Sequence, residues 1–467
     1  MAGSAIAGIL ERVGIIDRRR FRSTVDLAWP RIITGFAIMS KSTVDLAMVG
    51  IAVGTPAVAG LAFANAYWQL AKFAGIGLAG GVVTLISQAY GAENIPRARS
   101  VLVAGLLFAT VAGLPVVLAY VFFAGPLIGL FGPTETIQGY GRTYLLLVAP
   151  GLLFEFWNLI ASRTYAGVGN TLTPMAIRAT GALANVVLSA ALIFGAGLGV
   201  AGAAIGTAAS VAIVSLVFAW GLAGRSYFGR GACPVAIKRA AGLPDRRLLR
   251  ELFTVSAPLV ARRSAESIVA FPLLAIATSF GSVVVAAYEV GRRVRALVDS
   301  FSWGFSIASS TFVGQRLGAG DEADAEAYGW AIIRLSATVY VIVAAGVALL
   351  SRPIASLFVD TPEAIAQTSV FVVAAAASVI FLGLDGSATG TLRGAGDTRF
   401  PFVSSLVGRY GFGLTVAAAG MVTAFGAQAL LVAMVLETMV PAALNLSRVR
   451  SNRWKQISRG YRESLGD

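Results

Sequence analysis

The chain has 467 residues, of which 57% are hydrophobic and only 13% are charged, and its mean hydropathy is +0.78. It has no histidine and a single cysteine, Cys233, which excludes a histidine-based catalytic triad, a zinc site of His and Cys ligands and an intrachain disulfide. The formal charge of +14 at pH 7 would suggest nucleic acid binding in a soluble protein, so the placement of the basic residues decides its meaning.

Apolar runs of membrane-spanning length, about 18 to 25 residues each, recur from Val25 to Leu446. Breaking the hydropathy at Gly, Pro and charge clusters predicts twelve membrane-spanning helices, and therefore an all-α integral membrane protein. The predicted helices begin near Thr24, Pro56, Arg97, Thr136, Thr171, Val200, Leu248, Ser282, Asp324, Glu363, Arg399 and Phe425. The first residues lack a long apolar run followed by a small-residue cleavage site, so we expect no removable signal peptide.

Basic residues gather before the first predicted helix, in one central connection and after the last helix. They include Arg18, Arg19, Arg20 and Arg22, then Arg225, Arg230, Lys238, Arg239, Arg246, Arg247 and Arg250, and finally Arg448, Arg450, Arg453, Lys455, Arg459 and Arg462. The positive-inside rule then predicts a multi-pass protein of the plasma membrane with both termini in the cytoplasm. The basic surplus is better explained by this orientation and by anionic lipids than by nucleic acid.

Two motifs recur at one spacing. SQAYGA at 87–92 returns as GQRLGA at 314–319, and GVGNTLTP at 167–174 returns as GAGDTRFP at 394–401, each 227 residues further on. Because each half then holds an even number of helices, two six-helix lobes of the same orientation are expected, related by a pseudo-two-fold axis along the membrane normal. Such duplicated membrane halves are typical of secondary transporters.

The repeat sets the expected domain bounds. We expect an N-terminal lobe with its cytoplasmic segment at 1–224, a basic cytoplasmic loop at 225–247, a C-terminal lobe at 248–447 and a basic cytoplasmic tail at 448–467.

The chain closely resembles the multidrug and toxic compound extrusion (MATE) family at these motifs. VDLAMVG at the end of the first predicted helix, and NVVLS followed by GVAGAAIGTAAS, belong to the same resemblance. It implies two six-helix lobes arranged as a V. It also implies efflux of mostly cationic, amphipathic organic compounds, driven by an inward gradient of protons or sodium.

Ionisable groups at membrane depth are costly and are by default functional or paired. Asp45 lies 15 residues beyond Pro30, about 22 Å along a helix, and the resemblance assigns it the coupling cation. The alternative is a structural ion pair with Lys41, one turn back. Pro30 removes a backbone hydrogen bond and is the expected point of a helix switch.

The family's site also uses an Asn, an Asp one turn later and a Thr. This sequence supplies Asn185 and Thr207 but has Ser189 where the second Asp belongs. Because a sodium ion needs enough negative charge to replace its water, this departure favours proton coupling. A sodium site at Asp45, Asn185 and Thr207 stays open, as does a simple packing role for the two polar side chains.

Glu266 follows Pro258 by eight residues and matches an acidic coupling position in another branch of the family. Arg262 and Arg263 lie on the same helical face, so an intrahelical ion pair is an equal alternative. Asp385 is a weaker candidate for the same cleft, carried over from a family Asp about one turn away.

Aromatic side chains near a carboxylate would suit a lipophilic cation through stacking and cation–π attraction. The candidates for a substrate cleft are Tyr67, Trp68, Phe154, Trp157 and Tyr288. Most such residues are packing or interfacial anchors in membrane proteins.

The leading hypothesis is an antiporter that exports cationic or amphipathic compounds by alternating access, acting as a monomer without a cofactor or resident metal. Its partners are then a small organic substrate, H⁺ or Na⁺ and membrane lipids, with no nucleic acid. A flippase for a lipid-linked anion is the alternative, and Arg262, Arg263, Arg292, Arg293 and Arg295 favour it, although nearby acidic residues oppose them. An enzyme is not expected, because the sequence offers no nucleophile-and-base pair.

Overall fold

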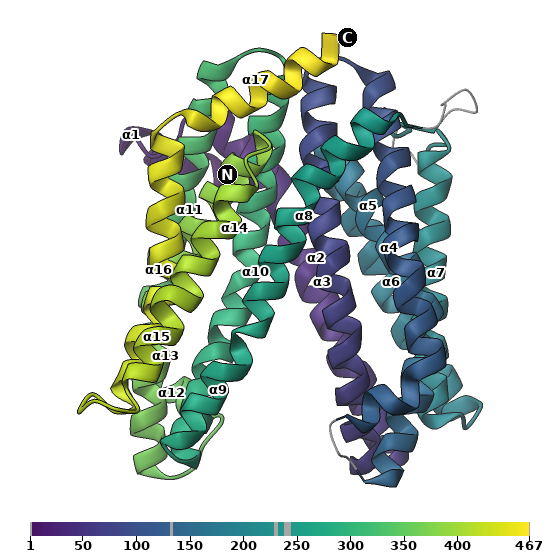
Figure 1. Ribbon diagram of the computed structural model, residues 1–467, viewed down its shortest axis with the longest axis vertical. Helices are drawn as coiled ribbons and strands as arrows, with labels where there is room; N and C mark the ends of the chain where they lie inside the picture. Colours follow the sequence, from purple (N-terminus) through teal and green to yellow (C-terminus); the bar gives the residue numbers. More distant parts are fainter. Residues whose placement is uncertain (1, 131–133, 228–231, 238–243, 467) are drawn as a thin grey trace. The chain divides into compact units, whose positions relative to one another are not determined.

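The computed structural model describes residues 2–130, 134–227, 232–237 and 244–466, and nearly all of them are helical (Figure 1). The predicted all-α class is therefore confirmed. Arg230, Lys238 and Arg239 of the predicted basic connection lie outside the described residues.

The helices follow one another along the chain with short connections. They are α1 (Ala2–Arg12), α2 (Arg18–Val53), α3 (Thr55–Gly91), α4 (Ile95–Gly129), α5 (Glu135–Gly167), α6 (Leu172–Ala190), η1 (Ala191–Gly195), α7 (Gly199–Leu222), α8 (Arg246–Ile268), α9 (Ala270–Ser279), α10 (Ser282–Gly318), α11 (Glu322–Leu349), α12 (Ser351–Ser356), α13 (Pro362–Gly394), α14 (Arg399–Leu406), η2 (Val407–Leu414), α15 (Thr415–Ala419), α16 (Gln428–Arg450) and α17 (Arg453–Gly466). The twelve predicted spans all correspond to helical segments in this order.

Ten helical stretches in the described part of the chain are long and apolar enough to cross a membrane. The other two predicted spans are α8 with α9, and α10, which carry several ionisable side chains. The seventh predicted span is broken at Val269 into α8 and α9, and the eleventh is built from α14, η2 and α15. The terminal helices α1 and α17 were not predicted, because hydropathy detects spans and not short amphipathic helices.

The chain divides into two compact units. The N-terminal unit contains Ile33–Tyr90 and Asn94–Val260, and the C-terminal unit contains Met1–Ile32, Gly91–Glu93 and Ala261–Asp467. The boundaries between the units thus fall inside α2 and α8, and on either side of the three residues at the end of α3 and after it.

Small residues let the helices of the N-terminal unit approach closely. α5 packs against α4 and α7, and α6 packs against α7. A Cβ atom on Gly206 of α7 would lie 2.6 Å from Ser189 Oγ and 2.9 Å from the Ser189 backbone on α6. The glycine therefore brings α6 and α7 together at the level of Asn185, Ser189 and Thr207, as small residues commonly do between membrane helices.

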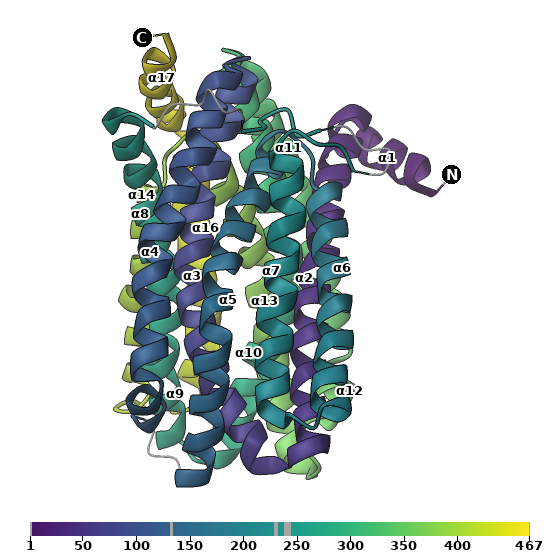
Figure 2. The same ribbon diagram turned by 90° about the vertical axis from the view of Figure 1, so that its right-hand side faces the viewer.

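In the C-terminal unit, α13 packs against α10, α11 and α16. Both terminal helices, α1 and α17, lie at the same end of this unit (Figures 1 and 2). Trp454 at the start of α17 is fully buried among Val313, Leu317 and Leu392, and its Nε1 donates to the Val449 carbonyl over 2.9 Å. Buried apolar contact therefore anchors the C-terminal helix.

Trp454→Ala is expected to lower the free energy of unfolding by about 3–5 kcal/mol, the usual cost of removing a large buried aromatic ring. The matched control is Trp220→Ala, because Trp220 is 49% exposed. Thermal unfolding of both variants in detergent measures the effect. Equal melting temperatures for the two variants would contradict the anchoring role of Trp454.

Candidate functional site

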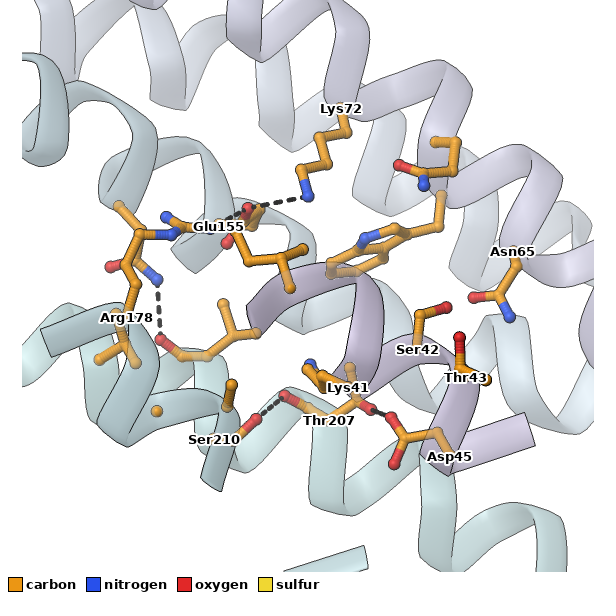
Figure 3. A pocket seen from close by; sticks show the side chains of 18 of the residues that line it. Lys41, Ser42, Thr43, Asp45, Asn65, Lys72, Glu155, Arg178, Thr207 and Ser210 are labelled. Carbon is orange, nitrogen blue, oxygen red and sulfur yellow. Dashed lines mark hydrogen bonds and ion pairs between the residues drawn. The ribbon is translucent and has the colours of Figure 1, made fainter. Parts of the chain in front are cut away.

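The N-terminal unit contains a cavity of about 360 Å³, lined by side chains from α2, α3, α5, α6 and α7 (Figure 3). Five of its lining residues have side chains that are charged in water at pH 7, namely Lys41, Asp45, Lys72, Glu155 and Arg178. Its volume lies within the usual range for small-molecule sites. Charged groups that line a cavity within membrane-spanning helices mark it as a candidate for substrate or ion binding.

Asp45 is 5% exposed and faces polar groups of α6 and α7. Thr207 Oγ1 lies 3.3 Å from Asp45 Oδ2 (Figure 3). With its nitrogen facing Asp45, the Asn185 amide donates to the two carboxylate oxygens over 3.0 and 3.1 Å, and its oxygen accepts from Thr207 over 3.1 Å. Ser189 Oγ lies 3.4 Å from the same amide. The structure therefore brings together the four residues that the resemblance placed at the N-lobe cation site.

Lys41 does not neutralise Asp45 by a direct ion pair. Among the described residues, its ammonium lies within 4 Å of no carboxylate oxygen, although Asp45 is one helical turn away. The sequence had left such a pair open as the alternative to a coupling role. The carboxylate is instead surrounded by neutral hydrogen-bond donors.

Sequence reasoning missed three charged residues of this cavity. Glu155 on α5 accepts from Arg178 Nη2 on α6 over 2.6 Å, and Lys72 Nζ on α3 lies 3.5 Å from the same Glu155 oxygen (Figure 3). Lys72 and Arg178 are each the single charge of an otherwise apolar predicted span, and Glu155 is the single acidic residue in the middle of its span. Charges at membrane depth were therefore the available signal.

Of the aromatic candidates, only Trp68 lines the cavity. Tyr67 donates to the Leu127 carbonyl over 2.6 Å, and Trp157 donates to Thr110 Oγ1 over 3.0 Å while its ring meets Phe154 edge to face. These three residues therefore have packing and hydrogen-bond partners elsewhere in the N-terminal unit.

In the C-terminal unit, Glu266 is surrounded by arginine side chains. Its carboxylate lies 2.9 Å from Arg262 Nε, 2.9 Å from Arg263 Nη1 and 3.6 Å from Arg409 Nη2. The two intrahelical ion pairs expected from the spacing are thus present, and a third cation joins them from η2.

Asp385 belongs to the same network. Its Oδ2 accepts from Arg262 Nη2 over 2.5 Å, and its Oδ1 accepts from Asn445 Nδ2 over 2.6 Å. Tyr288 is 2% exposed, and its ring packs edge to face on Phe371. Asp385 and Glu266 are therefore bridged by Arg262, whereas Tyr288 belongs to the core.

The sequence of the chain matches one family of known proteins. The model of the MatE family matches residues 30–191 and again residues 258–419, which together make up more than half of the chain. The chain belongs to the MatE family. Members of this family are multi-pass membrane transporters that move small molecules with ion coupling, and the two matches agree with the duplicated halves predicted from the motifs.

Individual MatE relatives cover most of the chain. A probable multidrug resistance protein NorM of Deinococcus radiodurans is 29% identical over 407 residues, covering 84% of this chain and 86% of the relative. A FAD transporter of Shewanella oneidensis is 24% identical over 370 residues, covering 78% and 79% of the two chains. A structure described as an outward-facing multidrug resistance MATE family transporter has a TM-score of 0.83 at 20% identity and covers 94% of this chain and 96% of its own.

Proposed function

We propose that the chain is a secondary active antiporter that exports amphipathic organic compounds, cationic ones included, in exchange for protons. The observation that carries the proposal is the buried Asp45 carboxylate beside a cavity of small-molecule size. The names of relatives such as the NorM protein of Deinococcus radiodurans support drug extrusion. Alternating access of the cavity to the two sides of the membrane completes the proposed cycle.

We assign the coupling to protons because Asp45 is, among the residues that the structure describes, the single carboxylate in contact with Asn185 and Thr207. Ser189 contributes no charge, and the Asn185 amide satisfies its hydrogen bonds by turning its nitrogen to the carboxylate. A sodium ion here would have one formal negative charge around it, which compensates poorly for the loss of its water. A proton requires only the carboxylate.

Glu266 is the second coupling candidate. Three guanidinium groups contact its carboxylate, so a proton bound there would leave those cations with less compensation. We therefore propose that Glu266 and Asp385 chiefly organise the C-terminal unit, and that coupling depends on Asp45.

The remaining features of the proposal follow from the sequence. We propose that the protein lies in the plasma membrane with both termini in the cytoplasm, on the distribution of its basic residues, and that it acts as a monomer. A flippase for a lipid-linked anion is the second candidate function, favoured by the three cations of the cavity. The cavity of about 360 Å³ suits a small molecule better than a lipid-linked one.

The test uses everted membrane vesicles that contain the full chain. Energised vesicles are expected to accumulate ethidium, a permanent cation, or rhodamine B, a zwitterion, and a protonophore should abolish the accumulation. Accumulation of neither dye, with the chain present and folded, would contradict the exporter assignment. Transport of a labelled lipid-linked anion alone would favour the flippase.

Pro30→Ala is expected to slow turnover more than it weakens substrate binding. Pro30 lies inside the continuous helix α2, where it removes one backbone hydrogen bond, and alanine restores that bond and stiffens the helix. Initial rates over a range of dye concentrations separate the maximal rate from the half-saturating concentration. A weakened binding at an unchanged maximal rate would place Pro30 in the pocket and not in the switch.

A further inference from the structure

The cavity of the N-terminal unit has a surplus of positive charge. Three cationic side chains line it, Lys41, Lys72 and Arg178, against the two carboxylates of Asp45 and Glu155. With both carboxylates ionised, the surplus is one positive charge, and with a proton on Asp45 it is two. A site of this kind in low-dielectric surroundings favours an anion over a simple organic cation.

Arg178 keeps unused hydrogen-bonding capacity. The residue is 8% exposed and donates through Nη2 to Glu155 over 2.6 Å. Its Nη1 has no hydrogen-bond partner within the described parts of the chain. An unsatisfied donor on a buried guanidinium is unfavourable, and a carboxylate is the group that matches a guanidinium best.

The ammonium of Lys41 is also uncommitted to a carboxylate. It lines the cavity, and no ion pair within 4 Å involves it among the residues that the structure describes. Lys72, by contrast, shares Glu155 with Arg178. The Glu155 carboxylate is thus the ion-pair partner of both Lys72 and Arg178 at one end of the cavity. The Lys41 side chain lies toward the Asp45 end (Figure 3).

Two further lining residues, Trp68 and Asn158, indicate which uncharged groups a ligand of this cavity would carry. Trp68 offers an aromatic ring to the cavity. Asn158 donates its Nδ2 to the Val211 carbonyl over 3.0 Å, but its Oδ1 is buried without a partner in the described structure. The site therefore suits a flat ring that bears an anionic group and an N–H or O–H donor.

We propose that this cavity is a binding site for aromatic carboxylates, in which Arg178, Lys72 and Lys41 hold the carboxylate and Trp68 contacts the ring. The proposal rests on the proposed function in one respect, namely that small molecules reach this cavity. The single charge of a carboxylate balances the surplus of one positive charge, whereas a phosphate monoester dianion would reverse its sign.

The charge balance also defines which carboxylates can be exchanged for protons. A pure anion and a proton on Asp45 favour each other's binding, because each compensates the charge of the other. A compound that in addition carries an amine near Asp45 competes with the proton for the carboxylate. Among carboxylates, those that this site can exchange for a proton therefore also carry an amine, with the carboxylate toward Arg178 and the amine toward Asp45.

The test is isothermal titration calorimetry of the purified full-length protein in detergent, with a detergent-only blank. The ligands are 2-naphthoate, 2-naphthylmethylammonium and 2-naphthyl phosphate, which share one ring system and differ in charge. We expect 2-naphthoate to bind more tightly than either of the others. Lys41→Gln should weaken 2-naphthoate binding by about tenfold or more, since a charged hydrogen-bond donor is lost.

Arg142→Gln is the matched control, because Arg142 is an exposed cation of α5 in the same unit and does not line the cavity. It should leave the affinity for 2-naphthoate unchanged. Asp45→Asn should tighten 2-naphthoate binding, because it removes a negative charge from the cavity, and it should also stop proton-driven transport. Binding and transport are measured separately, so a failure of the binding proposal can be told from a failure of the coupling role. Tighter binding of the ammonium or the phosphate compound, or equal effects of the Lys41 and Arg142 variants, would overturn the proposal. Should Lys41→Gln fail to fold, the ranking of the three ligands on the unchanged protein still decides it.

Discussion

Asp45→Asn is expected to reduce proton-driven dye efflux from proteoliposomes to the level of protein-free vesicles. Asparagine keeps the shape of the side chain but cannot take up and release a proton. Its oxygen can still accept from the Asn185 amide nitrogen, which lies 3.0 and 3.1 Å from the two oxygens of the Asp45 carboxylate. The free energy of unfolding is expected to fall by about 1 kcal/mol, because the new amide nitrogen then faces the amide nitrogen of Asn185, and both are donors.

Lys41→Met is the control for this prediction. If Asp45 acted only through a pair with Lys41, both variants would lose transport and stability alike. Since the two side chains form no direct ion pair within the described structure, Lys41→Met should keep proton-driven efflux of ethidium. Normal efflux by Asp45→Asn would refute the coupling role of this carboxylate.

Glu155→Ala is expected to destabilise the protein by about 3–5 kcal/mol, the usual cost of removing one partner from a buried ion pair. Arg178 and Lys72 both depend on this carboxylate, at 2.6 and 3.5 Å, and the Glu155 side chain is 5% exposed. Thermal unfolding in detergent measures the loss. The buried guanidinium of Arg178 is the expected source of most of it.

A second substitution tests that source. In Glu155→Met with Arg178→Met, apolar side chains of similar length replace the pair, and much of the lost stability should return. If the double variant is no more stable than Glu155→Ala, the uncompensated charge of Arg178 is not the cause. The two sites contact each other directly, so their effects are not expected to add.

The order of the spans was predictable because it depends on local hydropathy. The break between α8 and α9 was not predicted, although Pro272 follows Val269 by three residues and removes one backbone hydrogen bond at this point of the helix. The helix α17 was predicted only as a basic tail, because its apolar residues at helical spacing, Trp454, Ile457 and Tyr461, lie in a segment too basic to count as a span.

The candidate site was predictable only where a family motif covered it. The contact of Asp45 with Asn185 and Thr207 was expected from the resemblance, and the structure shows it. The cluster of Glu155, Arg178 and Lys72 comes from three separate helices, and only their packing brings the charges together. Similarly, the spacing predicted the intrahelical partners of Glu266 but not Arg409, which is distant in the sequence.

Ser189→Asp is expected to give the transporter a sodium response that the unchanged protein lacks. The substitution adds a second negative charge beside the Asn185 amide, which lies 3.4 Å from Ser189 Oγ. Two carboxylates with neighbouring neutral oxygens are a better substitute for the water shell of sodium than one. Dye efflux at increasing sodium concentrations measures the response, and no change would argue against a cation site at this position.

Dye efflux from proteoliposomes under separately imposed gradients tests the proposed proton coupling most directly. One pH unit supplies about 1.36 kcal/mol per proton, so a difference of two units across the membrane is a sufficient driving force. With a pH gradient and no sodium, the unchanged protein is expected to export the dye, and Asp45→Asn is not. With a sodium gradient at equal pH, neither should export it. Export by the unchanged protein under the sodium gradient alone would contradict proton coupling at Asp45.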